Sequence, residues 1–126
     1  MEKLSIKDIE DEVFPLSDKR VIGTLDDFDN LWVFPKEKDI EILAKKYNCK
    51  FLIKNFKNGK SIIFFKDLNK KTKEAIFLYG KYMDNFDSLS KEEHFLLGSY
   101  FGYSKKDISL FLKGLNFDSE FDDEES

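Results

Sequence analysis

The spacing of apolar residues along the chain predicts helices at several places. Near the start, apolar side chains recur at helical spacing from Leu4 to Val13, and Pro15 ends this pattern. A second helix is predicted after Pro35, a residue that suits the first turn of a helix. Its apolar positions are Ile40, Leu43, Ala44 and Tyr47.

Between these helices, shorter apolar runs indicate strands. Residues 20–25 and 31–34 read as two strands, and residues 26–30 read as a polar turn between them. Further along, residues 49–56 and 60–66 flank Asn58-Gly59, a dipeptide that accepts the positive φ angles of a tight hairpin turn. The unbroken apolar run 62–65 favours a strand that is covered on both faces, either a central strand of the sheet or one covered by a partner.

From Asn69 onward the pattern is helical. Ser90 with Glu93, and Ser104 with Asp107, have the spacing of helix-capping boxes. The order of elements predicts an α+β fold with a small mixed or antiparallel sheet of about four strands and about five helices, the last three C-terminal. We expect residues 1–117 to form a single domain and residues 118–126 to form an acidic, disordered tail.

Charge is distributed unevenly over the 126 residues, although the net charge is only −4. Residues 1–30 carry nine acids and four bases, whereas residues 50–73 carry eight lysines and a single acid, Asp67. The last segment adds six acids and no base. With 37% charged residues, no apolar run of membrane-spanning length and acids near the start, the sequence predicts a cytoplasmic protein with no membrane contact.

Catalytic and metal-binding motifs are weak. Cys49 and His94 are the one cysteine and the one histidine, and no motif surrounds either, so we expect no catalytic residues and no enzyme activity. The carboxylates of segment 26–30 fail the pattern of a calcium loop, because position 32 holds tryptophan instead of glycine. The glycines are scattered singly and form no phosphate loop, so we expect neither a metal nor a cofactor.

Residues 97–114 are the most motif-like stretch. Gly98 lies four residues before the turn glycine Gly102, Ser104 opens the next helix, and Ile108 and Phe111 follow at apolar positions. The stretch resembles the helix-turn-helix of small phage-repressor-like DNA-binding domains, which implies a DNA-binding regulator. The resemblance implies nucleic-acid contacts at the following positions: Lys105, Lys106, Ser109 and Lys113. The same pattern is typical of an ordinary helical hairpin with a glycine turn.

Protein binding is the hypothesis that the sequence favours. The second helix of the motif has no arginine, glutamine or asparagine for reading bases, and an acidic segment follows it. We therefore expect a small inhibitor or regulator in the class of immunity proteins, antitoxins and phage inhibitors, capturing a partner protein with a basic surface. The expected contact residues are Asp26, Asp27, Asp29, Trp32, Asp118, Glu120, Phe121, Asp122 and Asp123. DNA binding by residues 97–114 stays open as the alternative, and the lysine-rich band 50–73 could bind nucleic acid or the acidic tail.

Overall fold

The computed structural model confirms the α+β class. It describes residues 2–3, 6–17, 19–28, 32–33 and 36–114, and the predicted acidic tail lies outside these residues. The elements in chain order are β1 (Glu2–Lys3), α1 (Ile6–Val13), β2 (Ile22–Phe28), β3 (Trp32–Val33), α2 (Glu37–Lys46), β4 (Lys50–Phe56), β5 (Gly59–Phe65), α3 (Lys70–Asp84), α4 (Lys91–Tyr100) and α5 (Lys105–Gly114).

The main sheet is antiparallel, with the strand order β2-β5-β4. The predicted hairpin is confirmed, because β4 and β5 pair in register from Phe56↔Gly59 to Lys50↔Phe65, but its two turn residues are Lys57 and Asn58, and Gly59 already belongs to β5. The central position of β5 is confirmed too, and all of its residues from Ser61 to Phe65 are buried. The backbone N–H of Asn58 donates to the carbonyl of Met83 at 3.2 Å, which ties the hairpin turn to the end of α3.

The predicted four-strand sheet and the turn at 26–30 need correction. Strand β2 continues through Asp26 and Asp27 to Phe28, because β5 offers it seven consecutive pairing partners. Strand β3 does not join the main sheet and instead pairs in parallel with β1. Residues 29–31 lie outside the described part of the chain.

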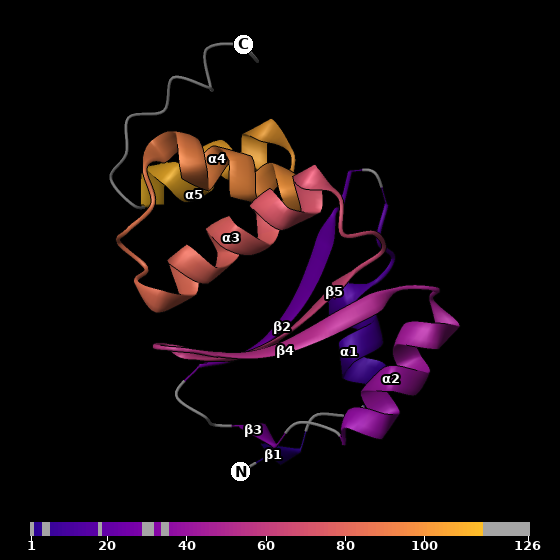
Figure 1. The fold of residues 1–126 in the computed structure, drawn as a ribbon. Helices are drawn as coiled ribbons and strands as arrows, with labels where there is room; N and C mark the ends of the chain where they lie inside the picture. Colours follow the sequence, from indigo (N-terminus) through magenta and orange to yellow (C-terminus); the bar gives the residue numbers. More distant parts are fainter. Residues whose placement is uncertain (1, 4–5, 18, 29–31, 34–35, 115–126) are drawn as a thin grey trace.

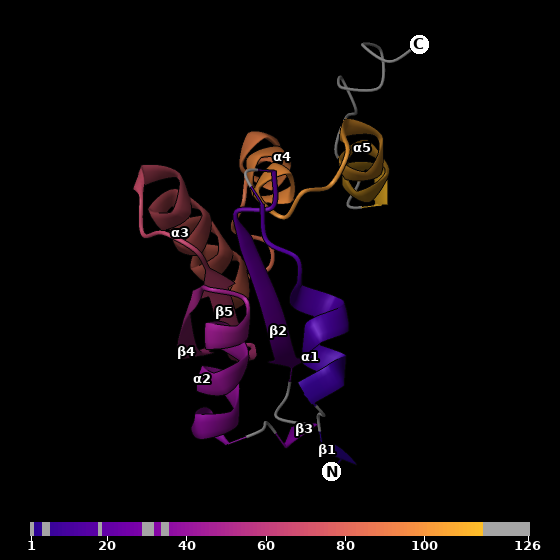
Figure 2. The ribbon, with the colours of Figure 1, turned by 90° about the vertical axis from the view of Figure 1, so that its right-hand side faces the viewer.

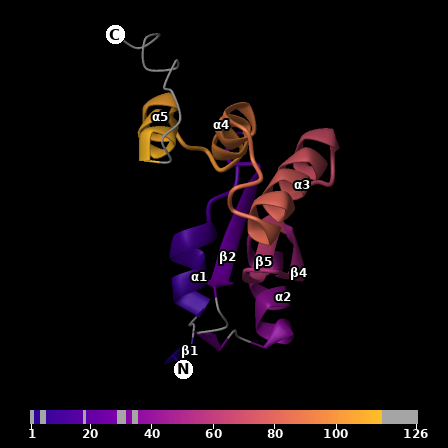
Figure 3. The ribbon, with the colours of Figure 1, turned by 90° about the vertical axis from the view of Figure 1, so that its left-hand side faces the viewer.

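Two apolar clusters cover the two faces of the sheet. Helices α1 and α2 lie on one face, where Val13, Ile40 and Phe64 are completely buried (Figure 1). Helix α3 lies across the other face, and Ile63 and Met83 belong to that cluster. Figures 2 and 3 both show α4 between α3 and α5. None of the helices in the described ranges has the length and apolar character that a membrane span needs.

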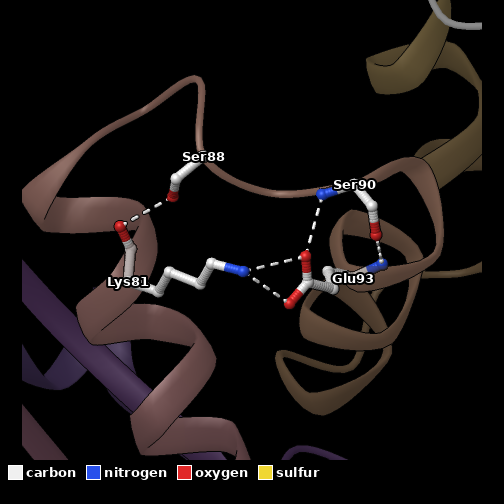
Figure 4. A network of polar contacts seen from close by, with 4 residues as sticks. All are labelled: Lys81, Ser88, Ser90 and Glu93. Atoms are coloured by element: carbon white, nitrogen blue, oxygen red, sulfur yellow. Dashed lines mark hydrogen bonds and ion pairs between the residues drawn. The ribbon is translucent and has the colours of Figure 1, made fainter.

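The predicted capping box at the start of α4 is present and links α4 to α3 (Figure 4). The Ser90 hydroxyl accepts from the backbone N–H of Glu93 at 3.1 Å, and the Glu93 carboxylate accepts from the backbone N–H of Ser90 at 3.0 Å. The Lys81 ammonium on α3 donates to the same carboxylate at 3.0 Å. The Ser90 N–H and Lys81 together lower the pKa of Glu93.

Candidate functional site

A pocket of about 490 Å³ lies between β2 and the three C-terminal helices. Thr24 and Asp26 enter it from β2, while Arg20 lines it from the segment before that strand. Helix α4 approaches α5 closely at this pocket, because a Cβ on Gly98 would lie only 2.9 Å from Cγ1 of Ile108. Asp107 on α5 adds a second carboxylate to the lining. With two carboxylates and one guanidinium in its lining, the pocket has a net negative charge.

Hydroxyl groups hold the Asp26 carboxylate in place. Oδ1 of Asp26 accepts from the Ser61 hydroxyl at 2.7 Å and from the Tyr79 hydroxyl, and these two hydroxyls are 2.6 Å apart. Oδ2 accepts from the Thr24 hydroxyl at 3.4 Å. Ser61 and Tyr79 are buried, so their rotamers are set by the surrounding core. The carboxylate is therefore presented to the pocket in a fixed orientation.

Aromatic rings form much of the pocket wall. His94 contacts Tyr82 and Phe111 in edge-on geometry, with centroid distances of 6.1 and 5.7 Å. At the mouth, Tyr103 and Phe111 are 61% and 48% exposed. Burial raises the pKa of Tyr82, and the Asp26 charge adds to that effect. Burial lowers the pKa of His94, which keeps the imidazole neutral at pH 7.

The structure separates the acids that the sequence grouped together. Because side chains alternate along a strand, Asp26 faces α3, whereas Asp27 points to the opposite face and is only 3% exposed. Asp27 is thus not available for a surface contact in this conformation. Trp32 lies in β3. The other expected partner-binding residues lie outside the described part of the chain. They are Asp29, Asp118, Glu120, Phe121, Asp122 and Asp123.

The residues of the DNA-binding alternative are split as well. Lys105, Lys106 and Lys113 are exposed on α5, but Ser109 is completely buried and its hydroxyl has no hydrogen-bond partner. Ser109 therefore cannot face a nucleic acid, because residue 109 points into the α5 packing interface. The Gly98 to Ile108 contact fits a helix-turn-helix and an ordinary helical hairpin equally well.

Cys49 and His94 lie on opposite sides of the sheet. Cys49 packs against the cluster formed with α1 and α2, whereas His94 contacts Tyr82 and Phe111 on the other side. A catalytic pair of these two residues is therefore excluded by the fold. In the described ranges, no group of three or more histidine, cysteine, aspartate or glutamate side chains is arranged to hold a metal ion.

Cys49 is expected to react slowly with alkylating reagents. Burial raises the pKa of its thiol to about 11. Because the thiolate is the reactive form, alkylation by iodoacetamide at pH 8 should be on the order of 100-fold slower than that of an exposed cysteine. The same protein unfolded in urea supplies the matched rate for the exposed thiol. Equal alkylation rates in the folded and unfolded protein would contradict the burial of the Cys49 thiol and its raised pKa.

Several pocket residues were missed by the sequence reasoning. Tyr79 falls in the predicted helical region after Asn69, where nothing local indicates a site, and its hydroxyl contact with Asp26 joins residues 53 positions apart. Thr24, Ser61 and Tyr82 gave no local signal, because a single polar residue in a strand or helix is too common to indicate a site. The one sequence signal for the pocket is that Thr24 and Asp26, two residues apart, place polar side chains on the same face of a strand.

No family model, no curated protein and no solved structure matches this chain.

Proposed function

We propose that this protein is a small non-enzymatic inhibitor or regulator that binds a partner protein, and that the pocket around Asp26 takes up a basic side chain of that partner. The supporting observation is a fixed carboxylate inside an aromatic pocket whose rim is exposed. The proposal keeps the electrostatic capture expected from the sequence, but it centres the contact on Asp26. The immunity-protein, antitoxin and phage-inhibitor class fits a single domain that works by binding.

Arginine has two properties that match this pocket, a positive charge and a planar group that stacks on aromatic rings. A guanidinium pairs with a carboxylate through directed hydrogen bonds and also stacks on aromatic faces. The net negative charge of the lining attracts it, although Arg20 at the same pocket reduces that attraction. Two of the lining residues, Tyr103 and Phe111, are 61% and 48% exposed, which provides apolar area to surround a charged contact.

The expected result is that a blocked arginine binds the pocket and that its uncharged analogue does not. Titration of the protein with N-acetyl-arginine amide should shift the backbone amide signals of residues 24–26, 79–82 and 103–111. N-acetyl-citrulline amide has nearly the same shape without the charge and is the matched control. The affinity of a single residue should be weak, with a Kd on the order of 1 mM. Equal shifts with both compounds, or none, would overturn the proposal.

Once affinity capture has identified the partner protein, the Kd of its complex can be measured with variants of the pocket. Asp26→Asn should weaken the complex at least about tenfold, because it removes the central charge. Asp87→Asn removes one charge from an exposed turn outside the pocket and should leave the Kd unchanged. Because Asp26 also bonds to Ser61 and Tyr79, Phe111→Ala provides a second variant, which removes a half-exposed ring of the pocket wall and should also weaken the complex.

A DNA-binding function would give a different outcome. It would appear as a sequence-specific shift of one duplex over scrambled competitor, lost when Lys105, Lys106 and Lys113 are replaced by glutamine. The protein-binding proposal expects no such shift at physiological salt. Asp107 and the exposed apolar side chains Leu110 and Phe111 on α5 support this expectation, because none of them suits a phosphate backbone.

A further inference from the structure

A second hollow lies on the other side of α3, between that helix and strand β4. This groove has a volume of about 780 Å³, and its apolar lining includes Leu52, Phe56, Leu68, Ile76 and Phe77. Phe77 is 67% exposed and Leu68 is 51% exposed, the first being the most exposed large apolar side chain among the described residues. An apolar groove beside a sheet edge is a common site for an extended peptide segment.

Gly80 allows α3 to lie close to β4 at the groove. A Cβ at this position would lie 3.3 Å from the Phe56 ring, closer than an ordinary van der Waals contact. Glycine therefore lets the Phe56 ring approach the α3 backbone, and both residues line the groove. Strand β4 is an edge of the three-strand sheet, so nothing in that sheet covers the groove from outside.

Positive charge surrounds the groove. Lys54 on β4 and Lys73 on α3 line it and are exposed. The two other charged lining residues are engaged within the fold: Lys81 binds Glu93 at 3.0 Å, and the Asp84 carboxylate accepts from the backbone N–H of Lys57 at 3.1 Å. The groove therefore suits a segment that combines apolar side chains with acids.

This chain contains such a segment. In the sequence Phe-Asp-Ser-Glu-Phe-Asp at 117–122, aromatic or small residues alternate with acids. An extended backbone would direct Phe117, Ser119 and Phe121 to one side and the three acids to the other. We propose that residues 117–122 of one copy bind the groove of a second copy, with the two phenylalanines in the groove and the acids beside Lys54 and Lys73.

The position of α5 argues against binding within one copy. Figures 2 and 3 show α4 between α5 and α3, and packed helix axes are about 8 to 10 Å apart. The groove lies on the side of α3 away from the Asp26 pocket, so both α3 and α4 lie between it and α5. Phe117 follows the last residue of α5, Gly114, by three residues, which span at most about 11 Å when extended. A second copy can supply the segment without this limit, and a two-fold dimer would use both grooves.

The proposal is independent of the proposed function, because the groove and the Asp26 pocket lie on different sides of α3. Dimerisation would nevertheless change the role of the acidic segment. When residues 117–122 are bound to a neighbouring copy they cannot attract a basic partner, so the Asp26 pocket would have to bind the partner by itself. Dilution or a competing partner would release the segment.

Sedimentation equilibrium of the full chain tests the proposal. The wild-type mass should rise from one copy to two over about 1 µM to 1 mM protein at low salt, and added salt should oppose the rise. The double variant Phe117→Ser/Phe121→Ser should remain a monomer throughout, and so should Phe77→Ser. Ile42→Ser, which alters a 59% exposed side chain on α2, is the matched control and should dimerise like the wild type. Circular dichroism melting verifies that each variant is folded.

Charge reversal separates a direct contact from a general loss of structure. Lys54→Glu/Lys73→Glu should abolish the dimer, and adding Asp118→Lys/Glu120→Lys to the same chain should restore it. A wild type that stays monomeric over the whole range would overturn the proposal. So would a dimer that survives the Phe117→Ser/Phe121→Ser change, or a failure of the reversed charges to restore association.

Discussion

Replacing Phe64 with alanine is expected to cost about 3 to 5 kcal/mol of unfolding free energy, the range for a phenylalanine deleted from a packed core. Phe64 lies on the central strand β5 and is completely buried. Its ring contacts those of Phe14 and Phe51, with centroid distances of 5.1 and 6.3 Å. The truncation would leave a cavity between the sheet and α1, because the neighbouring strands prevent collapse.

Urea unfolding followed by circular dichroism measures this cost. Because single domains are stable by about 5 to 15 kcal/mol, Phe64→Ala alone could leave too little folded protein to analyse. Phe64→Leu retains most of the volume and should cost less than about 1.5 kcal/mol. Ile42→Ala changes an exposed apolar residue on α2 and should stay within about 0.5 kcal/mol of wild type. Similar losses for Phe64→Leu and Phe64→Ala would contradict the packing argument.

Gly23→Ala is expected to destabilise the fold by about 3 kcal/mol, the upper part of the usual range for overpacking. A Cβ on Gly23 would lie 2.6 Å from the carbonyl oxygen of Val13 and 2.7 Å from its Cγ1. The first of these atoms belongs to the backbone of α1, so it cannot move aside without shifting the helix from the sheet. Inside a strand, replacing glycine with alanine usually stabilises a protein by about 0.5 to 1 kcal/mol. The steric conflict at Gly23 is expected to outweigh this gain, so that the substitution destabilises the fold.

Gly114→Ala supplies the comparison, because nothing lies within 4 Å of a Cβ at that position. This substitution at the end of α5 should be neutral or slightly stabilising. Thermal unfolding of both variants at one pH gives the difference directly. If the Gly23→Ala and Gly114→Ala variants both unfolded at the wild-type temperature, the close packing of α1 on β2 at Gly23 would be contradicted.

Helix α3 separates two surfaces of opposite character. On one side, the Asp26 pocket combines carboxylates with aromatic rings and suits a basic group. On the other side, the groove beside β4 combines exposed Phe77 and Leu68 with lysines and suits an acidic segment. Neither site includes residues of the other, so the two proposed ligands would not compete for the same side chains.

Local sequence signals predicted the elements that depend on neighbouring residues. The β4–β5 hairpin forms where the Asn58-Gly59 dipeptide predicted it, although its two turn residues are Lys57 and Asn58 and only Gly59 of the dipeptide has a positive φ, of 155°. The Ser90 and Glu93 capping box starts α4 where expected, because its hydrogen bonds join residues three positions apart. The run 62–65 indicated a strand covered on both faces, and helices cover β5 on both faces.

The strand boundaries near Asp26 could not be predicted in the same way. Two aspartates are typical of a turn, but pairing with β5 extends β2 through both of them. The hydrogen bonds from Ser61 and Tyr79 compensate for placing the Asp26 carboxylate over the sheet. Likewise, β3 pairs with β1, an interaction between residues 30 positions apart that no local pattern indicates.

The sequence by itself determined the class of the fold, the hairpin and the segregation of charge along the chain, because turn preferences, capping and apolar periodicity act over a few residues. Only the tertiary structure decided which charged residues line a pocket. It placed Asp26 in a pocket and buried Asp27 on the other face, since adjacent residues of a strand point in opposite directions. It also brought Ser61 and Tyr79 to Asp26 across 35 and 53 residues, a convergence that depends on the packing of α3 over the sheet.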